Sequence, residues 1–158
     1  MAAPSATARS TPGGIKLDDG FSTKLTIAAD VDISFWEKTV QPPGIDGGDA
    51  IETSTMHNTT WRTMSPRALR TLTPLSVTAA YDPAVFTQLV SVTNLETTIT
   101  VTFPDGSTLA FYGYVQNTEP SDNTEGEQPE LTVTIQPTNQ DPSTGSEEAP
   151  VLVEVAGT

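Results

Sequence analysis

The stretch ETTITVTFPDGSTLAFYGYVQN, residues 96–117, decides the fold class of this chain. Apolar residues alternate with Thr over 97–103, and they alternate with Ala, Tyr and Gln over 109–116. This two-residue period is typical of half-buried β-strands. PDGS at 104–107 provides the turn, because Gly106 can adopt the positive φ that tight hairpins demand. The stretch therefore predicts an antiparallel β-hairpin.

The same alternation continues on both sides of this hairpin. Strands are predicted from residue 21 to 35, over 72–81 and over 131–135, and 151–155 could form a last edge strand. Residues 82–90 differ, because Asp82 can cap a helix and Pro83 suits its first position. Val and Thr are poor helix formers, so a further strand is the alternative there. The chain is predicted to be mainly β, a β-sandwich or open barrel with one short α-helix and a long extended loop.

The long loop is the polar excursion from Gln41 to Leu69. Its first part, QPPGIDGGD at 41–49, holds two prolines and three glycines, which exclude a helix or a central strand. Long irregular connections are uncommon inside compact domains and are often functional. Six large apolar residues lie along it, too many for an inert linker. Ser65 and Pro66 predict a short helical turn through Arg70.

Bulk composition limits the organisation and the compartment. A chain of 158 residues fits one principal domain, and roughly one residue in six is Thr, which favours strands and turns. We expect a flexible N-terminal arm at 1–14, a β domain at 15–137, and a polar linker with the edge strand at 138–158. Cys is absent, which excludes disulfides and thiolate sites. No apolar signal-peptide region or membrane-length run is seen, so synthesis in a cytoplasm is expected.

Charge is divided unevenly along the chain. The net charge is −13, yet all seven basic residues lie within the first 70 positions. Twelve carboxylates follow, from Asp82 to Glu154, with no Lys or Arg among them. A well-solvated acidic surface explains this pattern, and so does a role for Arg62, Arg67 and Arg70 in binding acidic surface on another copy. A chain this acidic is not expected to bind phosphate backbones through counterion release.

Catalytic and metal motifs are weak. His57 is the single histidine and lies in a loop rich in Thr and Asn, so a nucleophilic triad lacks its parts. Asp46 and Asp49 form a faint calcium-loop pattern without the terminal Glu. Trp36 is expected to pack in the core or at its rim. Trp61 beside Arg62 has the composition of an interface anchor, although simple packing is an equal alternative.

Three segments together resemble the tail tube (major tail) proteins of long, non-contractile-tailed bacteriophages. The first is PPGIDGGD at 42–49 running into IETSTMHN at 51–58 and WRT at 61–63. The second is AAYDP at 79–83. The third is TVTFPDGS at 100–107, followed by FYGYV at 111–115 and TVTIQ at 132–136. The resemblance covers roughly residues 20 to 137.

This resemblance implies a structural, non-enzymatic subunit that needs no cofactor. Six copies would close into a ring, and stacked rings would surround the tape-measure protein and later conduct DNA. Tail terminator and baseplate or initiator proteins would be further partners, without specific DNA binding or a membrane, and the mature location would be the virion tail. The expected inter-subunit or inter-ring loop comprises Pro43, Gly44, Ile45, Asp46, Ile51, Met56, Trp61, Arg62, Arg67 and Arg70. The candidates for the lumen surface are Thr98, Thr100, Thr102, Thr132 and Thr134.

Two other functions fit parts of the sequence. A monomeric β-sandwich recognition or adhesion module would use the excursion as a binding loop. An enzyme with a carboxylate or calcium site would use Asp46 and Asp49, and calcium would then stabilise the fold.

Overall fold

The predicted hairpin is present in the computed structural model, which describes residues 22–29 and 32–154. Strand β9 (Thr97–Thr102) pairs antiparallel with β10 (Thr108–Pro120), and Val101 lies opposite Leu109. Gly106 adopts a φ of 89° in the turn between them. Alternate residues of both strands enter the core, as their two-residue period predicts. The hairpin prediction is therefore confirmed.

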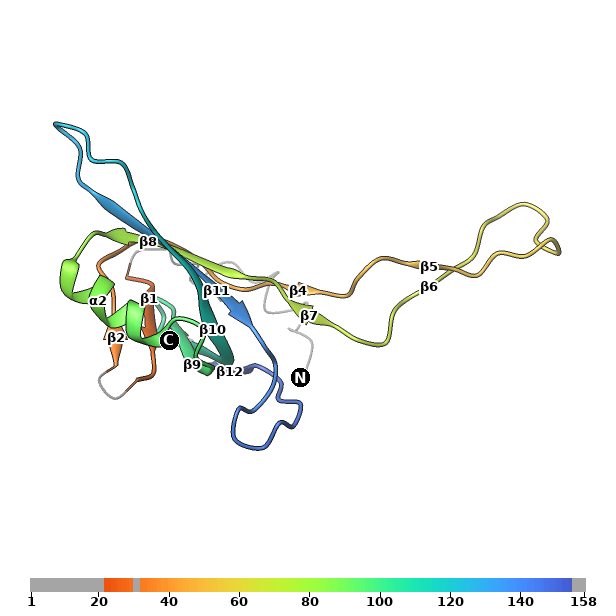
Figure 1. Ribbon diagram of the computed structural model, residues 1–158. Helices are drawn as coiled ribbons and strands as arrows, with labels where there is room; N and C mark the ends of the chain where they lie inside the picture. The colour runs from red at the N-terminus through yellow and green to blue at the C-terminus, as the bar shows by residue number, and fades with distance from the viewer. Residues whose placement is uncertain (1–21, 30–31, 155–158) are drawn as a thin grey trace, which may run out of the picture.

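The hairpin forms the centre of an eight-stranded antiparallel sheet (Figure 1). Its strand order is β2-β1-β9-β10-β11-β8-β3, and β12 pairs with the start of β10. The sheet stays open and is not closed into a barrel, which agrees with the predicted mainly β sandwich or open-barrel class. The other strands of this sheet are β1 (Lys24–Ile27), β2 (Ile33–Ser34), β3 (Glu37–Gln41), β8 (Leu75–Ala80), β11 (Glu130–Pro137) and β12 (Val151–Val153).

The sheet curls around a single apolar core. Leu25, Ile99, Val133 and Ile135 are fully buried within it, and no polar residue among those described is buried. The curl brings β3 close to β1, where the Leu25 amide donates a hydrogen bond to Glu37 Oε1 at 2.9 Å. That amide lies beyond the reach of β2, whose pairing with β1 covers only Thr26 and Ile27. Glu37 therefore satisfies a backbone group that would otherwise lack a partner.

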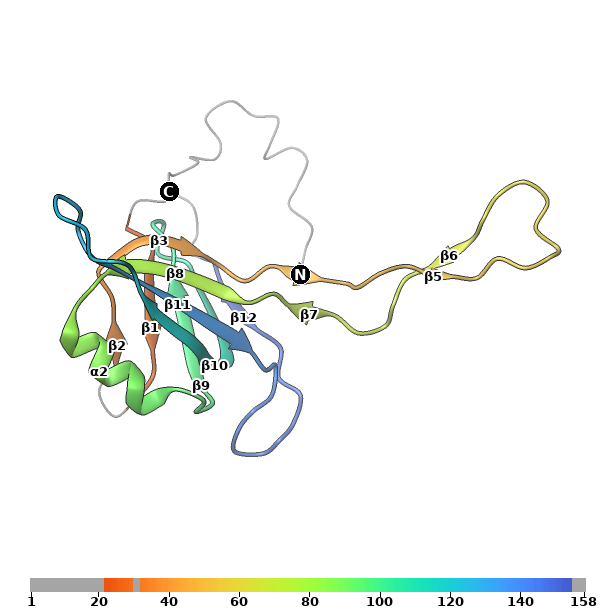
Figure 2. The ribbon, with the colours of Figure 1, turned by 45° about the horizontal axis from the view of Figure 1, so that its top comes forward.

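Helix α2 (Pro83–Val92) is the one helix in the described part of the chain, and it covers one end of the curled sheet (Figure 2). Asp82 accepts a hydrogen bond from the Ala84 amide at 2.9 Å, so it caps the helix as predicted. Val85, Leu89 and Val92 recur at helical spacing and face the core. The helix prediction is confirmed, and the alternative of a strand is wrong.

The excursion is a two-stranded arm that projects from the body (Figure 1). Its outgoing limb contains β4 (Ile45–Asp46) and β5 (Ile51–Glu52). Its returning limb contains β6 (Met64–Ser65) and β7 (Thr71–Leu72), which pair antiparallel with β5 and β4. At about 3.3 Å per residue, a limb from 41 to 56 extends roughly 50 Å.

Several local predictions differ from the structure. The helical turn predicted after Ser65 is wrong, because Ser65 pairs with Ile51 in the arm and is held in extended conformation. Trp36 is not a core residue, since 69% of its surface is exposed. The predicted strand 72–81 is interrupted at Thr73 and Pro74, where β7 of the arm ends before β8 begins. Sequence reasoning also missed β3, because its burial pattern is irregular around a bulge between Glu37 and Thr39.

Candidate functional site

The arm exposes large apolar side chains that contact no core. Met56 at the tip is 100% exposed and Trp61 is 82% exposed. Ile45, Ile51, Met64 and Leu69 are exposed along the limbs as well. Apolar side chains gathered on one projecting element are typical of interaction surfaces. All six apolar residues that the sequence placed in the excursion are therefore available to a partner.

Polar side chains hold the arm together in place of a core. Thr53 and Thr63 join the limbs through a side-chain hydrogen bond of 2.9 Å and through a bond from the Thr53 amide to the Thr63 carbonyl. The Thr63 amide in turn donates to Ser54 Oγ at 2.9 Å. Asn58 donates from Nδ2 to the Trp61 carbonyl at 2.8 Å across the tip. The Thr, Ser and Asn content of the excursion thus satisfies its backbone without using the apolar residues.

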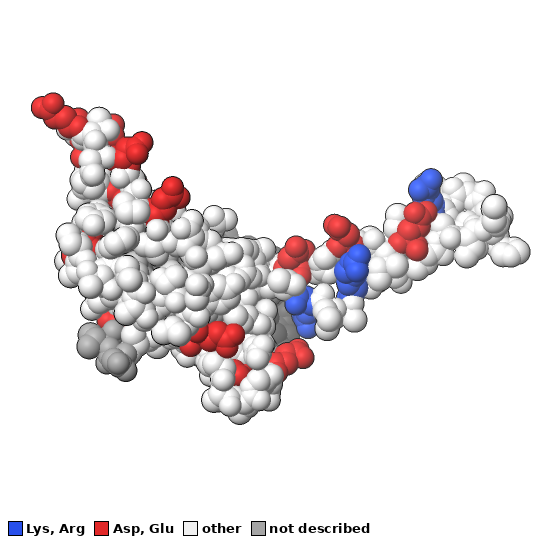
Figure 3. Space-filling model, viewed as in Figure 1, with Lys and Arg blue, Asp and Glu red and all other residues white. Residues whose placement is uncertain are grey.

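All three arginines predicted to bind a neighbour lie on the returning limb. Arg62 makes an exposed ion pair with Glu52, with 3.4 Å between Nη1 and Oε1. Arg67 donates from Nε to the Asp49 carbonyl at 2.8 Å. No ion pair is found for Arg70 within the described ranges 22–29 and 32–154. Figure 3 shows these cations alternating with carboxylates along the arm.

The base of the arm contains the first residues of the predicted interface. Ile45 lies opposite Leu72 where β4 pairs with β7. The Gly44 amide donates to Thr73 Oγ1 at 2.8 Å, which joins the outgoing limb to the link between β7 and β8. Asp46 Oδ1 accepts from the Gly48 amide at 2.9 Å. This segment therefore forms a local turn, and no group of three His, Asp or Glu side chains in the described part of the chain is arranged to hold a metal.

The five threonines proposed for a lumen lie on one face of the sheet, opposite the core. Thr100 lies between Thr26 on β1 and Ala110 on β10. Thr132 lies between Thr78 on β8 and Glu119 on β10. Because directly paired residues share a face, this surface also includes residues that sequence reasoning did not connect. They include Thr26, Thr39, Thr78 and Glu119, and only the strand register shows that they share this face with the five threonines.

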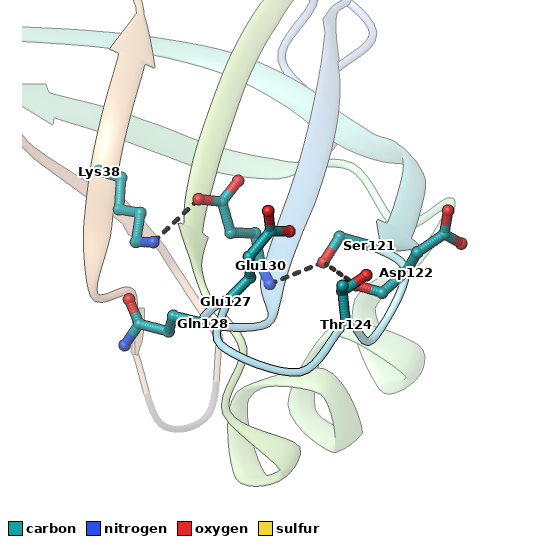
Figure 4. A pocket seen from close by; sticks show the side chains of 7 residues that line it. All are labelled: Lys38, Ser121, Asp122, Thr124, Glu127, Gln128 and Glu130. Atoms are coloured by element: carbon teal, nitrogen blue, oxygen red, sulfur yellow. Dashed lines mark hydrogen bonds and ion pairs between the residues drawn. The ribbon is translucent and has the colours of Figure 1, made fainter.

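A hollow of about 560 Å³ lies at the acidic tip of the β10–β11 hairpin (Figure 4). Lys38 makes a 2.9 Å ion pair with Glu130 at its edge. The Glu130 amide donates to Ser121 Oγ at 2.9 Å. In Figure 4 the Asp122 carboxylate points away from the Lys38–Glu130 pair. The hollow therefore contains carboxylates that do not converge on one point.

Two further features of the described residues concern the single histidine and the possibility of a membrane-spanning helix. His57 is exposed at the tip of the arm, among Thr and Asn residues. None of the helices described has the length and apolar character that crossing a membrane requires.

The sequence matches no protein-family model and no curated protein. The fold is nevertheless shared with solved structures. A chain of the anti-feeding prophage baseplate, determined by cryo-EM with 6-fold symmetrisation, superposes with a TM-score of 0.65 at 5% identity, covering 87% of this chain and 96% of that one. A chain from the tail of the empty gene transfer agent particle, with C6 symmetry, superposes with a TM-score of 0.61 at 9% identity, covering 89% of this chain and 100% of that one. A chain from the native gene transfer agent virion superposes with a TM-score of 0.63 at 7% identity, covering 87% of this chain and 100% of that one.

At these identities the likeness shows the fold alone. The class defined by the fold is an open, curled β-sheet closed at one end by a helix, with a two-stranded arm projecting from it. Chains with this fold occur in a tail, a baseplate and a virion.

Proposed function

We propose that this chain is the structural subunit of a tail tube, in which copies close into hexameric rings and the rings stack. The observation that carries the proposal is the projecting arm, because it holds the four most exposed large apolar side chains among the described residues, Met56, Trp61, Leu69 and Ile45. Head-to-tail contacts between different surfaces generate closed rings and open-ended stacks. The shared fold with chains from six-fold symmetric particles supports this assembly.

In this proposal the arm forms the inter-subunit or inter-ring contact. Met56 and Trp61 would supply apolar area, and Trp beside Arg is a frequent composition of binding hot spots. Arg62, Arg67 and Arg70 would meet acidic surface on a neighbour. The Pro43–Asp46 base would set the direction in which the arm leaves the body.

The Thr-rich face of the sheet would line the bore, with Thr98, Thr100, Thr102, Thr132 and Thr134 among its residues. Hydroxyl groups and a net negative charge do not hold phosphate, so DNA would pass without specific binding. The tube would surround a tape-measure protein and would meet tail terminator and baseplate or initiator proteins at its ends. Its location would be the virion tail of a non-contractile-tailed phage, after synthesis in the host cytoplasm, and it would act without a cofactor or catalysis.

The division of the chain follows from the same proposal. Residues 15–137 would form the tube domain, and 138–158 would be a linker ending at the edge strand that pairs with β10. The segment 1–14, predicted to be a flexible arm, lies outside the described residues.

Negative-stain electron microscopy of the concentrated, incubated protein tests the proposal. Tubes or rings with six-fold symmetry are expected. A monomer that stays monodisperse at high concentration, and also when seeded with tail initiator complexes, would contradict it. That result would favour the monomeric recognition module, in which the arm binds a different partner.

A further inference from the structure

The arm and helix α2 lie at opposite ends of the molecule, as both ribbon views show (Figures 1 and 2). The tip of the arm therefore cannot reach the surface beside α2 of its own chain. Any contact between the two must join different copies. Such a contact uses two different surfaces, and where it is not reciprocated it leaves one of each free to bind a further copy.

A groove of about 590 Å³ lies beside α2, between the helix and strands β1 and β2. Ala28, Ala29 and Ser91 contribute small side chains, which leave the space open. Ile33 and Val92 form apolar parts of its lining, and Leu95 stands at its edge with 57% of its surface exposed. A volume of this size is within the range of sites that take large side chains or small ligands, roughly 300–1,000 Å³.

Among the described residues that line the groove and the hollow beside it, there are carboxylates and no cations. Glu96 belongs to the groove itself. An adjoining hollow, which shares Gln88 with the groove, is lined by Asp32, Asp82 and the exposed Trp36. The returning limb of the arm has the opposite character, because residues 53–70 include three arginines and no carboxylate. The charge of the distal arm is balanced, because Arg62 pairs with Glu52. The complementarity therefore rests on the apolar tip residues facing the groove and on Arg62 facing its acidic rim.

We propose that the groove beside α2 receives the distal arm, residues 51–64, of a second copy of this chain. Met56 and Trp61 enter the groove, where they pack against the exposed side chains of Ala28, Ala29 and Leu95. Arg62 exchanges its exposed pairing with Glu52 for the acidic rim at Glu96. This inference rests on the proposed function, and it names the receptor surface for the arm.

Disulfide trapping tests the contact directly, because the chain contains no cysteine of its own. The double variant Met56→Cys/Leu95→Cys is incubated for assembly and then oxidised with diamide. Adjacent copies are expected to form a ladder of covalent multimers on a non-reducing gel. The control is Met56→Cys/Thr124→Cys, whose second cysteine lies on the acidic β10–β11 hairpin tip, and it should give at least tenfold less product.

Electron microscopy of the same samples separates this inference from the proposed function. Tubes with a ladder support both. Tubes without a ladder, or with a stronger ladder from the Thr124 control, overturn the groove contact and leave the tube intact. A ladder without tubes supports the contact and counts against the tube. If neither tubes nor a ladder form, both the groove contact and the tube are overturned.

A matched pair of helix-side variants gives a second readout. Leu95→Arg places a cation at the edge of the groove and should reduce assembly at least tenfold at a fixed concentration. Val90→Arg introduces the same charge on α2 at a position that is 63% exposed and does not line the groove, so it should assemble normally. Circular dichroism checks that both variants fold. Equal assembly of the two variants would contradict the proposal.

Discussion

Arg67 donates a hydrogen bond from Nε to the carbonyl oxygen of Asp49, at 2.8 Å, and so joins the two limbs of the arm near its middle. Gly48 makes room for this contact. Its φ is +78°, and a Cβ built there would lie 2.8 Å from Arg67 Cδ. The polar middle of the arm therefore depends on a glycine at one position and on an arginine that contacts it.

Gly48→Ala should loosen the arm without unfolding the domain. A left-handed conformation costs a residue other than Gly about 1–2 kcal/mol, and the new methyl group would displace Arg67. Amide hydrogen exchange at Thr53 and nearby arm residues should become roughly tenfold faster. The control is Gly47→Ala, where a Cβ meets no atom within 4 Å. Equal exchange in the two variants would count against a role for Gly48.

Truncation of a buried helix residue should destabilise the domain far more than truncation of its exposed neighbour. Leu89 is fully buried on the core-facing side of α2, whereas Val90 on the same helix is 63% exposed. Leu89→Ala should lower the free energy of unfolding by about 2–5 kcal/mol. Val90→Ala should change it by less than about 0.5 kcal/mol. Urea denaturation followed by circular dichroism measures both, and similar midpoints would show that α2 does not close the core.

Asp82 should contribute to stability through its cap. Its carboxylate accepts from the Ala84 amide, one of the backbone groups that have no partner within the helix. Asp82→Ala should lower the free energy of unfolding by about 1 kcal/mol. Asp82→Asn should retain most of the stabilisation that the cap provides, because Asn also accepts at this position. Thermal unfolding of the three proteins provides the comparison. An Asn variant as unstable as the Ala variant would indicate that charge, rather than the cap, is responsible.

The turn between β9 and β10 should be sensitive to acid. The Ser107 hydroxyl donates to Asp105 Oδ1 at 2.6 Å and its amide donates at 2.9 Å, and these bonds lower the pKa of Asp105. A carboxyl whose pKa is lower in the folded state stabilises the fold above its unfolded pKa. That contribution disappears as the pH falls through the folded pKa. The turn should therefore hold at neutral pH and loosen in strong acid.

Ser107→Ala should raise the pKa of Asp105 toward its ordinary value, as followed by NMR of the carboxyl carbon. The pKa of Asp141, lowered by the corresponding bonds from Ser143, serves as the internal control and should not move. An unchanged Asp105 titration would show that the hydroxyl does not hold this carboxylate.

Replacement of Arg62, Arg67 and Arg70 by Glu should block assembly and leave a folded monomer. Exposed ion pairs contribute only about 1 kcal/mol or less each, so single substitutions are expected to have little effect. The corresponding triple Gln variant removes the attraction without adding repulsion, and it should assemble more weakly than the native chain but better than the Glu variant. Sedimentation of assembled material measures all three. Assembly unchanged by the triple Glu substitution would rule out the ionic contact.

The strand and helix predictions succeeded where the side chains that form the local pattern are also the ones that pack in the core. The alternation over 97–116 had to place one face on a core, since that face is apolar throughout. The cap and the apolar spacing of 82–90 similarly indicated a helix, which in the structure extends to Val92. The helical turn predicted from Ser65 to Arg70 is absent. The capping signal of Ser65 and Pro66 is weaker than the pairing of Ser65 with Ile51 on the other limb.

The candidate surfaces were only partly accessible from the sequence. The exposed apolar residues of the arm could be recognised, because no period assigned them to a core. The shared face of Thr100 and Thr132 depends on the register of four strands, which no local pattern specifies. The exposure of Trp36 could not be predicted either, since a large aromatic residue next to a strand usually packs inward.

By itself, the sequence determined the β class, the central hairpin, the helix that follows Asp82 and the unusual character of residues 41–69. These follow from side-chain periodicity and turn chemistry, which act over a few residues. Only the tertiary structure decided that the excursion is a paired arm, that the sheet stays open, and that a groove with an acidic rim lies at the end opposite the arm. The reason is that these features depend on pairing and packing between segments far apart in the chain.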